Sequence, residues 1–180
     1  ADLLKSGRSR AANFMRLVAP AGKVLVIEPD PYSFRELLDF VRKYNLQDVC
    51  VPVNKGVWKE SGVLTFLVSR DHPASGQLLT VAEARGEKTD PSTEKIDVPV
   101  DTLKAICEEH DFPNPQLLSI TTNGAELNIL EGSRSWLDGY SGYVSLALTG
   151  QGYEAAMNKY GYSVEALDDR GILFSRSDSV

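Results

Sequence analysis

The sequence is poor in the residues that build metal sites and disulfide frameworks. Its 180 residues include two cysteines and two histidines, and neither Cys50 nor Cys107 has a neighbour at metal-ligand or redox spacing. We therefore predict no metal site. The two thiols are expected to be buried and free, which is compatible with a reducing compartment, and we expect the chain to be cytoplasmic.

A long apolar run and an excess of basic residues are also missing. No apolar run approaches the roughly 20 residues that a membrane-spanning helix needs, so we predict a soluble protein that does not act at a membrane. With 19 Lys and Arg against 25 Asp and Glu, the formal net charge is −6. This balance argues against a nucleic-acid partner. It says little about small-molecule substrates or about the oligomeric state.

What the sequence does contain is an alternation of short apolar runs and amphipathic segments. Apolar runs predict strands at residues 23–28, 49–53, 63–68, 96–100, 116–122 and 143–148, and helical spacing predicts helices at 10–18, 31–45, 101–107, 124–137 and 153–160. Asp30 and Asp101 are expected to cap the helices that follow them. Residues 70–95 are rich in Gly, Pro, Ser, Thr and charge, and we expect a long surface loop there.

Strands that alternate with helices indicate an α/β fold with a mostly parallel, doubly wound sheet. Residues 162–167 and 172–174 are expected to close it as an antiparallel hairpin. We predict one domain over residues 1–180. The chain begins at Ala1 without a pattern typical of a signal peptide, and we expect the first strand of the sheet to be lacking or truncated.

The strongest candidate for a ligand contact is Glu28. Ligands of open α/β sheets bind outside the carboxyl ends of the strands, and Glu28 ends a predicted strand. A carboxylate there can accept hydrogen bonds from two adjacent ribose hydroxyls. A solvent-exposed acid without a ligand explains the residue equally well, so Glu28 alone leaves both interpretations open.

Several short motifs occur in an order that is typical of one enzyme family. They are Glu28-Pro29-Asp30-Pro31, Asn54-Lys55-Gly56-Val57, Val100-Asp101-Thr102-Leu103, Gly124-Ala125-Glu126 and Gly161-Tyr162. In this order and spacing, from about residue 16 to residue 174, the sequence resembles the FkbM-type methyltransferases, which use S-adenosylmethionine. The resemblance implies a class I methyltransferase (Rossmann-like) fold.

The resemblance also implies roles for individual residues. Glu28, with Pro29 and Asp30, would hold the ribose of S-adenosylmethionine. The adenine pocket would be lined by residues 54–57, including Asn54, Gly56 and Val57. The methyl acceptor would be an oxygen of a sugar-like or other small-molecule hydroxyl compound.

The sequence departs from the family pattern at three places, one of them Ala147, which stands roughly where the family carries a glutamate on the following strand. The glycine-rich loop of the family is represented by Gly7 alone within Lys5-Ser6-Gly7-Arg8-Ser9, and side chains in place of the other glycines would crowd the cofactor. The family's D-V-E motif is replaced by Thr121-Thr122-Asn123. Thr121 and Asn123 can orient a hydroxyl group by hydrogen bonds, but neither is an effective base near neutral pH.

Three functional hypotheses follow. The first is an O-methyltransferase for small molecules, in which Thr121 and Asn123 orient the acceptor and His72, in the long loop, is a candidate base. The second is a catalytically inactive binding or interaction module that keeps the fold, favoured by the lost carboxylates. The third, a nucleotide-binding dehydrogenase, is opposed by the lack of a G-x-G-x-x-G sequence between strand and helix.

Overall fold

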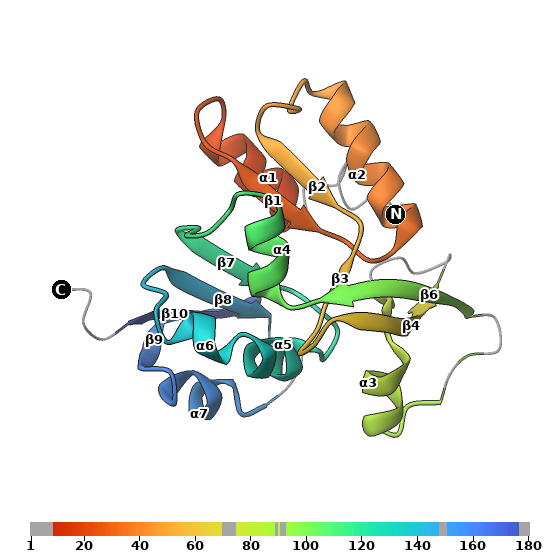
Figure 1. Ribbon diagram of the computed structural model, residues 1–180, viewed down its shortest axis with the longest axis vertical. Helices are drawn as coiled ribbons and strands as arrows, with labels where there is room; N and C mark the ends of the chain where they lie inside the picture. The colour runs from red at the N-terminus through yellow and green to blue at the C-terminus, as the bar shows by residue number, and fades with distance from the viewer. Residues whose placement is uncertain (1–8, 70–74, 89, 91–92, 148–150, 177–180) are drawn as a thin grey trace. The chain divides into compact units, whose positions relative to one another are not determined.

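The structure, a computed structural model, describes residues 9–69, 75–88, 90, 93–147 and 151–176 and divides into two compact units (Figure 1). The first unit comprises residues 1–56 and 62–100, and the second comprises residues 57–61 and 101–180. The fold is mixed α/β, as the sequence predicts. No helix among the described residues is long and apolar enough to cross a membrane.

The first unit begins with two helices that pack against a pair of parallel strands. These elements are α1 (Arg10–Val18), β1 (Val24–Ile27), α2 (Pro31–Lys43) and β2 (Cys50–Val53). Parallel pairing aligns Val24 with Cys50 and Ile27 with Val53. Apolar residues at helical spacing on α1 and α2 meet the strands in one buried cluster, which includes Met15, Leu37, Phe40, Val41 and Cys50. This core places the carboxyl ends of β1 and β2 next to each other.

The start of α2 follows from the residues that the sequence offers there. Asp30 is the N-cap, and its Oδ1 accepts the Tyr32 N–H at 3.0 Å. Pro31 occupies the first helical position, where its missing N–H and fixed φ are tolerated. The predicted start of this helix is therefore confirmed, and the chain leaves β1 through a three-residue turn, Glu28-Pro29-Asp30.

The rest of the first unit is built on a second sheet, in which β4 (Gly62–Val68) pairs antiparallel with β5 (Gln77–Leu78) and β6 (Glu94–Asp101). Strands β4 and β6 pair from Gly62 with Val100 to Val68 with Glu94. The sheet has the order β3-β6-β4-β5, where β3 is Gly56–Val57. Helix α3 (Leu79–Ala84) follows β5. The expectation of one long loop over residues 70–95 is wrong at this point, because Leu78, Val81 and Ala82 are buried and anchor regular structure.

The second unit contains a four-stranded mixed sheet with the order β7-β8-β10-β9. Its strands are β7 (Leu117–Ile120), β8 (Tyr143–Ala147), β9 (Tyr162–Leu167) and β10 (Gly171–Arg176), and its helices are α4 (Leu103–Glu109), α5 (Glu126–Gly132), α6 (Arg134–Leu137) and α7 (Tyr153–Asn158). β7 and β8 are parallel, whereas β10 is antiparallel to β8 and to β9. The predicted closing hairpin is confirmed.

The predicted cap of α4 is wrong by one residue. Thr102 is the N-cap, and its hydroxyl accepts the Ala105 N–H at 3.2 Å. The Asp101 carboxylate instead accepts the Thr102 N–H at 2.8 Å and the Ser61 hydroxyl. Either side chain can cap a helix. Asp101 is the final residue of β6, one position before the N-cap position of α4.

The pairing of the strands differs from the single, mostly parallel sheet that the sequence predicts. Parallel pairing holds β1 to β2 and β7 to β8, while β4 and β6 are antiparallel.

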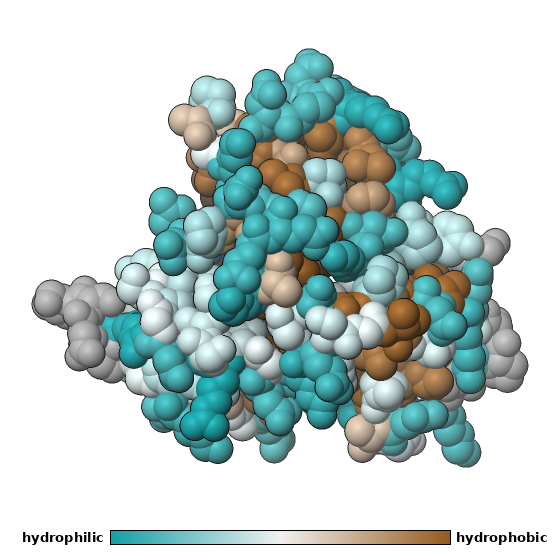
Figure 2. Space-filling view, in the orientation of Figure 1, coloured by the Kyte–Doolittle hydropathy of each residue, from teal (hydrophilic) through white to brown (hydrophobic). Residues whose placement is uncertain are grey.

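Hydrophilic residues cover most of the face shown in Figure 2, with apolar side chains between them, as is usual for folded proteins. Among the described residues, no group of three or more His, Cys, Asp or Glu side chains is arranged to hold a metal ion.

Candidate functional site

The candidate site lies in the first unit, at the carboxyl ends of β1 and β2. Because Ile27 is aligned with Val53 in the parallel pair, the next residues, Glu28 and Asn54, leave the sheet at the same edge. The Glu28 N–H continues the ladder by donating to the Val53 carbonyl at 3.0 Å. The structure thus brings together Glu28, Pro29, Asp30 and Asn54, four of the residues that the sequence assigns to a cofactor.

Hydrogen bonds fix the turn after β1 at every residue. The Asn54 side-chain amide donates to the Glu28 carbonyl at 2.8 Å and to the Pro29 carbonyl at 3.3 Å. The Asp30 N–H donates to Oε1 of Glu28 at 3.0 Å, and the Asp30 carbonyl accepts the Phe34 N–H at 2.8 Å. The main chain of the turn is therefore held by the Asn54 side chain and by the first turn of α2. The Asp30 N–H in turn orients one oxygen of the Glu28 carboxylate.

Asp30 is buried because the start of α2 uses its carboxylate. Only 3% of the residue is exposed. Its Oδ1 accepts the Tyr32 N–H, and its Oδ2 accepts the Ser33 hydroxyl at 2.7 Å. These two hydrogen bonds offset the desolvation of the carboxylate. Asp30 therefore contributes to the site as a helix cap and through its main-chain N–H.

The pKa of the Glu28 carboxyl group is raised from 4.5 to about 7. Burial is the main cause, because it disfavours the charged form, and the nearby charge of Asp30 acts in the same direction. The hydrogen bond from the Asp30 N–H opposes both effects. A partly buried carboxyl group that ionises near neutral pH is a common property of ligand-binding and catalytic sites.

Gly56 lies close to this turn and has no room for a side chain. A Cβ atom there would come within 2.9 Å of Cγ1 of Val100 and 3.7 Å of Cβ of Pro29. The close approach of β3 to Val100 therefore favours glycine, whereas the distance to Pro29 is an ordinary van der Waals contact. Val57, the next predicted cofactor contact, is partly buried and belongs to the second unit.

The predicted acceptor-orienting residues lie in the second unit, just after β7. Thr121 is exposed and Asn123 is partly buried. Thr121 and Asn123 belong to the second unit and Glu28 belongs to the first. The structure therefore does not group these two residues with Glu28. His72 and Gly7, the candidate base and the remnant of the glycine-rich loop, lie outside the described residues.

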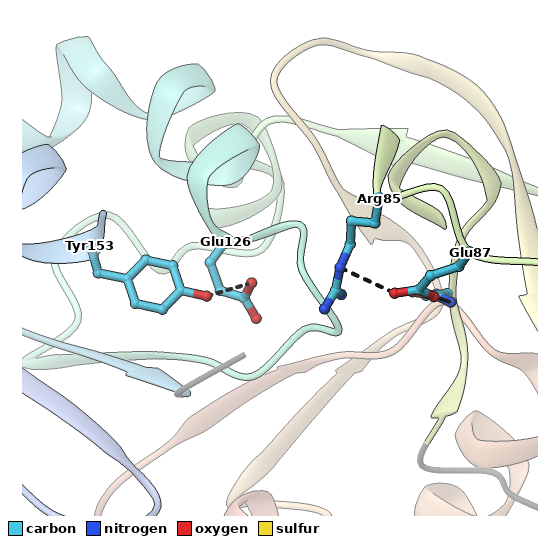
Figure 3. Close-up of polar contacts among 5 residues, drawn as sticks. Arg85, Glu87, Glu126 and Tyr153 are labelled. Atoms are coloured by element: carbon cyan, nitrogen blue, oxygen red, sulfur yellow. Dashed lines mark hydrogen bonds and ion pairs between the residues drawn. The ribbon is translucent and has the colours of Figure 1, made fainter. Parts of the chain in front are cut away.

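A buried carboxylate in the second unit was not singled out as a site by the sequence reasoning. Glu126, the first residue of α5, is fully buried, and its Oε2 accepts the Tyr153 hydroxyl at 3.2 Å (Figure 3). Oε1 has no hydrogen-bond partner in the described part of the chain. Glu126 belongs to the family motif Gly124-Ala125-Glu126, so the sequence did point to this position. A glutamate in the first turn of a helix is usually exposed, and its burial therefore could not be predicted.

Comparison with known proteins identifies the family. Residues 5–141 match the model of the methyltransferase FkbM domain, so the chain belongs to the FkbM methyltransferase family. The family predicted from the motifs is confirmed. The search of curated proteins gives no match.

Among solved structures, the fold is similar to that of methyltransferase FkbM from Methylobacillus flagellatus KT, with a TM-score of 0.52 and 14% sequence identity. The match covers 85% of this chain and 36% of that protein. This chain therefore spans little more than a third of the length of the solved relative. At such low identity the likeness supports a shared fold.

Proposed function

We propose that this chain binds S-adenosylmethionine through Glu28 and transfers its methyl group to a small-molecule hydroxyl group. The observation that carries the proposal is the Glu28 carboxylate, held at the end of β1 by the Asp30 N–H in a chain of the FkbM family. The family is one of methyltransferases.

The chemistry of the turn suits a ribose. A carboxylate has about four lone-pair positions, and the Asp30 N–H occupies one of those on Oε1. The other positions can accept two adjacent ribose hydroxyls in charge-assisted hydrogen bonds. A Cβ atom on Gly56 would lie 3.7 Å from Cβ of Pro29, and we assign these two residues, with Asn54 and Val57, to the surroundings of the nucleoside.

The acceptor side of the reaction is a separate part of the proposal. S-adenosylmethionine supplies an already activated methyl group, so the protein mainly has to position the acceptor and assist loss of its proton. Thr121 and Asn123 are proposed to orient the acceptor hydroxyl, and His72 is the proposed base. We also propose that the fold is of the class I methyltransferase type.

We also propose a cytoplasmic location, which the cysteines support. Cys50 and Cys107 are both free and buried. Free thiols persist in reducing compartments, whereas secreted proteins tend to pair them.

Calorimetric titration with S-adenosylmethionine and S-adenosylhomocysteine tests the proposal. The wild-type chain is expected to bind both ligands with micromolar affinity, and Glu28→Ala is expected to lose binding. The matched control is Glu36→Ala, which removes an exposed carboxylate from α2 and is expected to bind like wild type.

Three outcomes would count against the proposal. Folded wild-type protein that gives no heat with either ligand would contradict cofactor binding. Binding that survives Glu28→Ala would place the cofactor elsewhere. Binding without methyl transfer to any hydroxyl compound would support the inactive module, which the Thr121-Thr122-Asn123 sequence favours.

A further inference from the structure

The strongest unassigned feature of the candidate site is the way Asn54 contacts the turn after β1. An amide that lines a nucleoside pocket would be expected to direct its N–H groups toward the ligand. The Asn54 amide nitrogen instead donates to the carbonyls of Glu28 and Pro29, at 2.8 and 3.3 Å. An –NH₂ group has two hydrogens to donate, so these two hydrogen bonds occupy its full donor capacity.

The two carbonyls lie where the chain leaves the sheet. The Glu28 N–H still belongs to the β1–β2 ladder through the Val53 carbonyl, but the chain turns away at Pro29, and proline has no N–H to continue the pairing. Asn54 leaves β2 at the same edge, one residue after Val53. Its side chain therefore replaces the main-chain donor that a longer strand would supply.

The orientation of the Glu28 carboxylate depends on this contact. Its Oε1 is held by the Asp30 N–H at 3.0 Å, and Asp30 is fixed in turn as the buried N-cap of α2. The peptide groups between the two residues are those whose carbonyls Asn54 holds. Release of these carbonyls would let the turn rotate and move the Asp30 N–H away from the carboxylate.

We propose that Asn54 is a positioning residue, which acts on the cofactor by holding the Glu28–Pro29 turn so that the Glu28 carboxylate faces the ribose hydroxyls. This inference rests on the proposed function, because it assumes that Glu28 binds the ribose. It assigns Asn54 a role that differs from a direct contact with adenine.

The test combines ligand affinity with hydrogen exchange in Asn54→Ala. Asn54 is exposed, so water can solvate the two released carbonyls and the variant is expected to fold. Its affinity for S-adenosylhomocysteine is expected to fall about tenfold. The matched control is Gln47→Ala, which removes another exposed amide from the same unit and is expected to keep wild-type affinity.

Hydrogen exchange of the Asp30 amide provides the readout that a general loss of stability would not reproduce. In Asn54→Ala this amide is expected to exchange at least about tenfold faster, while amides inside α2 and β2 keep their rates. If Asn54→Ala does not fold, Asn54→Asp gives the same test, because it keeps the size of the side chain and replaces its donors with acceptors.

The outcomes separate the inference from the proposed function. Wild-type affinity in Asn54→Ala, or faster exchange spread evenly over α2 and β2, would overturn the positioning role. If the wild-type chain does not bind S-adenosylhomocysteine, the proposed function fails, whereas the exchange of the Asp30 amide still shows whether Asn54 holds the turn.

Discussion

Glu28 combines burial with a main-chain hydrogen bond, and these two features have opposite effects on its ionisation. Burial raises the pKa of the carboxyl group to about 7, whereas the Asp30 N–H favours the charged form. The residue therefore holds a proton in the folded protein at pH values where the unfolded chain has lost it. Folding stability and ligand binding should both respond to this proton.

The first prediction concerns folding stability and Glu28→Gln. Between pH 4.5, the ordinary pKa, and pH 7 the folded state binds more protons than the unfolded state, so the contribution of Glu28 to stability falls as pH rises through this window and is constant above it. Glutamine cannot ionise. We expect Glu28→Gln to be more stable than wild type at pH 8 by on the order of 1 kcal/mol, since water screens part of the charge of this partly exposed group.

Urea denaturation at pH 8 and at pH 4 measures this difference. At pH 4 the two proteins should have closely similar unfolding free energies, because the glutamate is then largely protonated in both states. An equal difference at both pH values would show that the effect of the substitution is unrelated to the proton.

At the scale of elements, the segments predicted best are those whose signals are local. Helix α2 has an N-cap, a proline at its first position and apolar residues at helical spacing, all within 13 residues. The hairpin of β9 and β10 joins strands that are adjacent in the sequence. By contrast, β5 and α3 were not predicted. Leu78 and Val81 are buried, but they belong to a short apolar run, and the polar residues around 77–84 favour a loop in the sequence.

The second prediction concerns the contact between α5 and α7. Tyr153→Phe removes the hydroxyl that donates to Oε2 of the fully buried Glu126. Because Oε1 has no partner among the described residues, the carboxyl group would lose its hydrogen bond without gaining water. We expect the variant to be destabilised by about 1–3 kcal/mol, measured by urea denaturation.

Tyr143→Phe is the matched control for this prediction. It removes a tyrosine hydroxyl from a side chain on β8 that is 48% exposed, so its effect should stay within about 0.5 kcal/mol. Equal losses in the two variants would show that the Glu126–Tyr153 hydrogen bond has no special role.

At the scale of the whole molecule, the order of motifs predicted the family, whereas the pairing of strands that are distant in the sequence could not be predicted. Glu28-Pro29-Asp30 and the residues near Asn54 occur at family spacing, and the match over residues 5–141 confirms that reading. The antiparallel pairing of Gly62 with Val100 joins residues far apart in the sequence, and alternating apolar residues do not specify a partner strand. For the same reason the hydrogen bonds of Asn54 to the turn could not be predicted, although both segments were.

The last prediction concerns the thermal stability of the whole chain with S-adenosylhomocysteine. At a ligand concentration about 100 times the Kd measured at pH 8, binding should stabilise the folded state by about 2.7 kcal/mol. For a chain of this size that corresponds to a rise in Tm of about 5–10 °C. Ribose hydroxyls donate hydrogen bonds to the ionised carboxylate, so binding should weaken as pH falls below about 7, where Glu28 takes up a proton.

The same ligand concentration at pH 5.5 should therefore give a much smaller shift. If the protonated form does not bind, the affinity at this pH is about thirtyfold lower, and the remaining stabilisation is about 0.9 kcal/mol, or a few degrees. Differential scanning fluorimetry at the two pH values measures both shifts, with Glu36→Ala as the control that should follow wild type. Equal shifts at pH 8 and pH 5.5, or a full shift in Glu28→Ala, would exclude the Glu28 carboxylate as the group that holds the ribose.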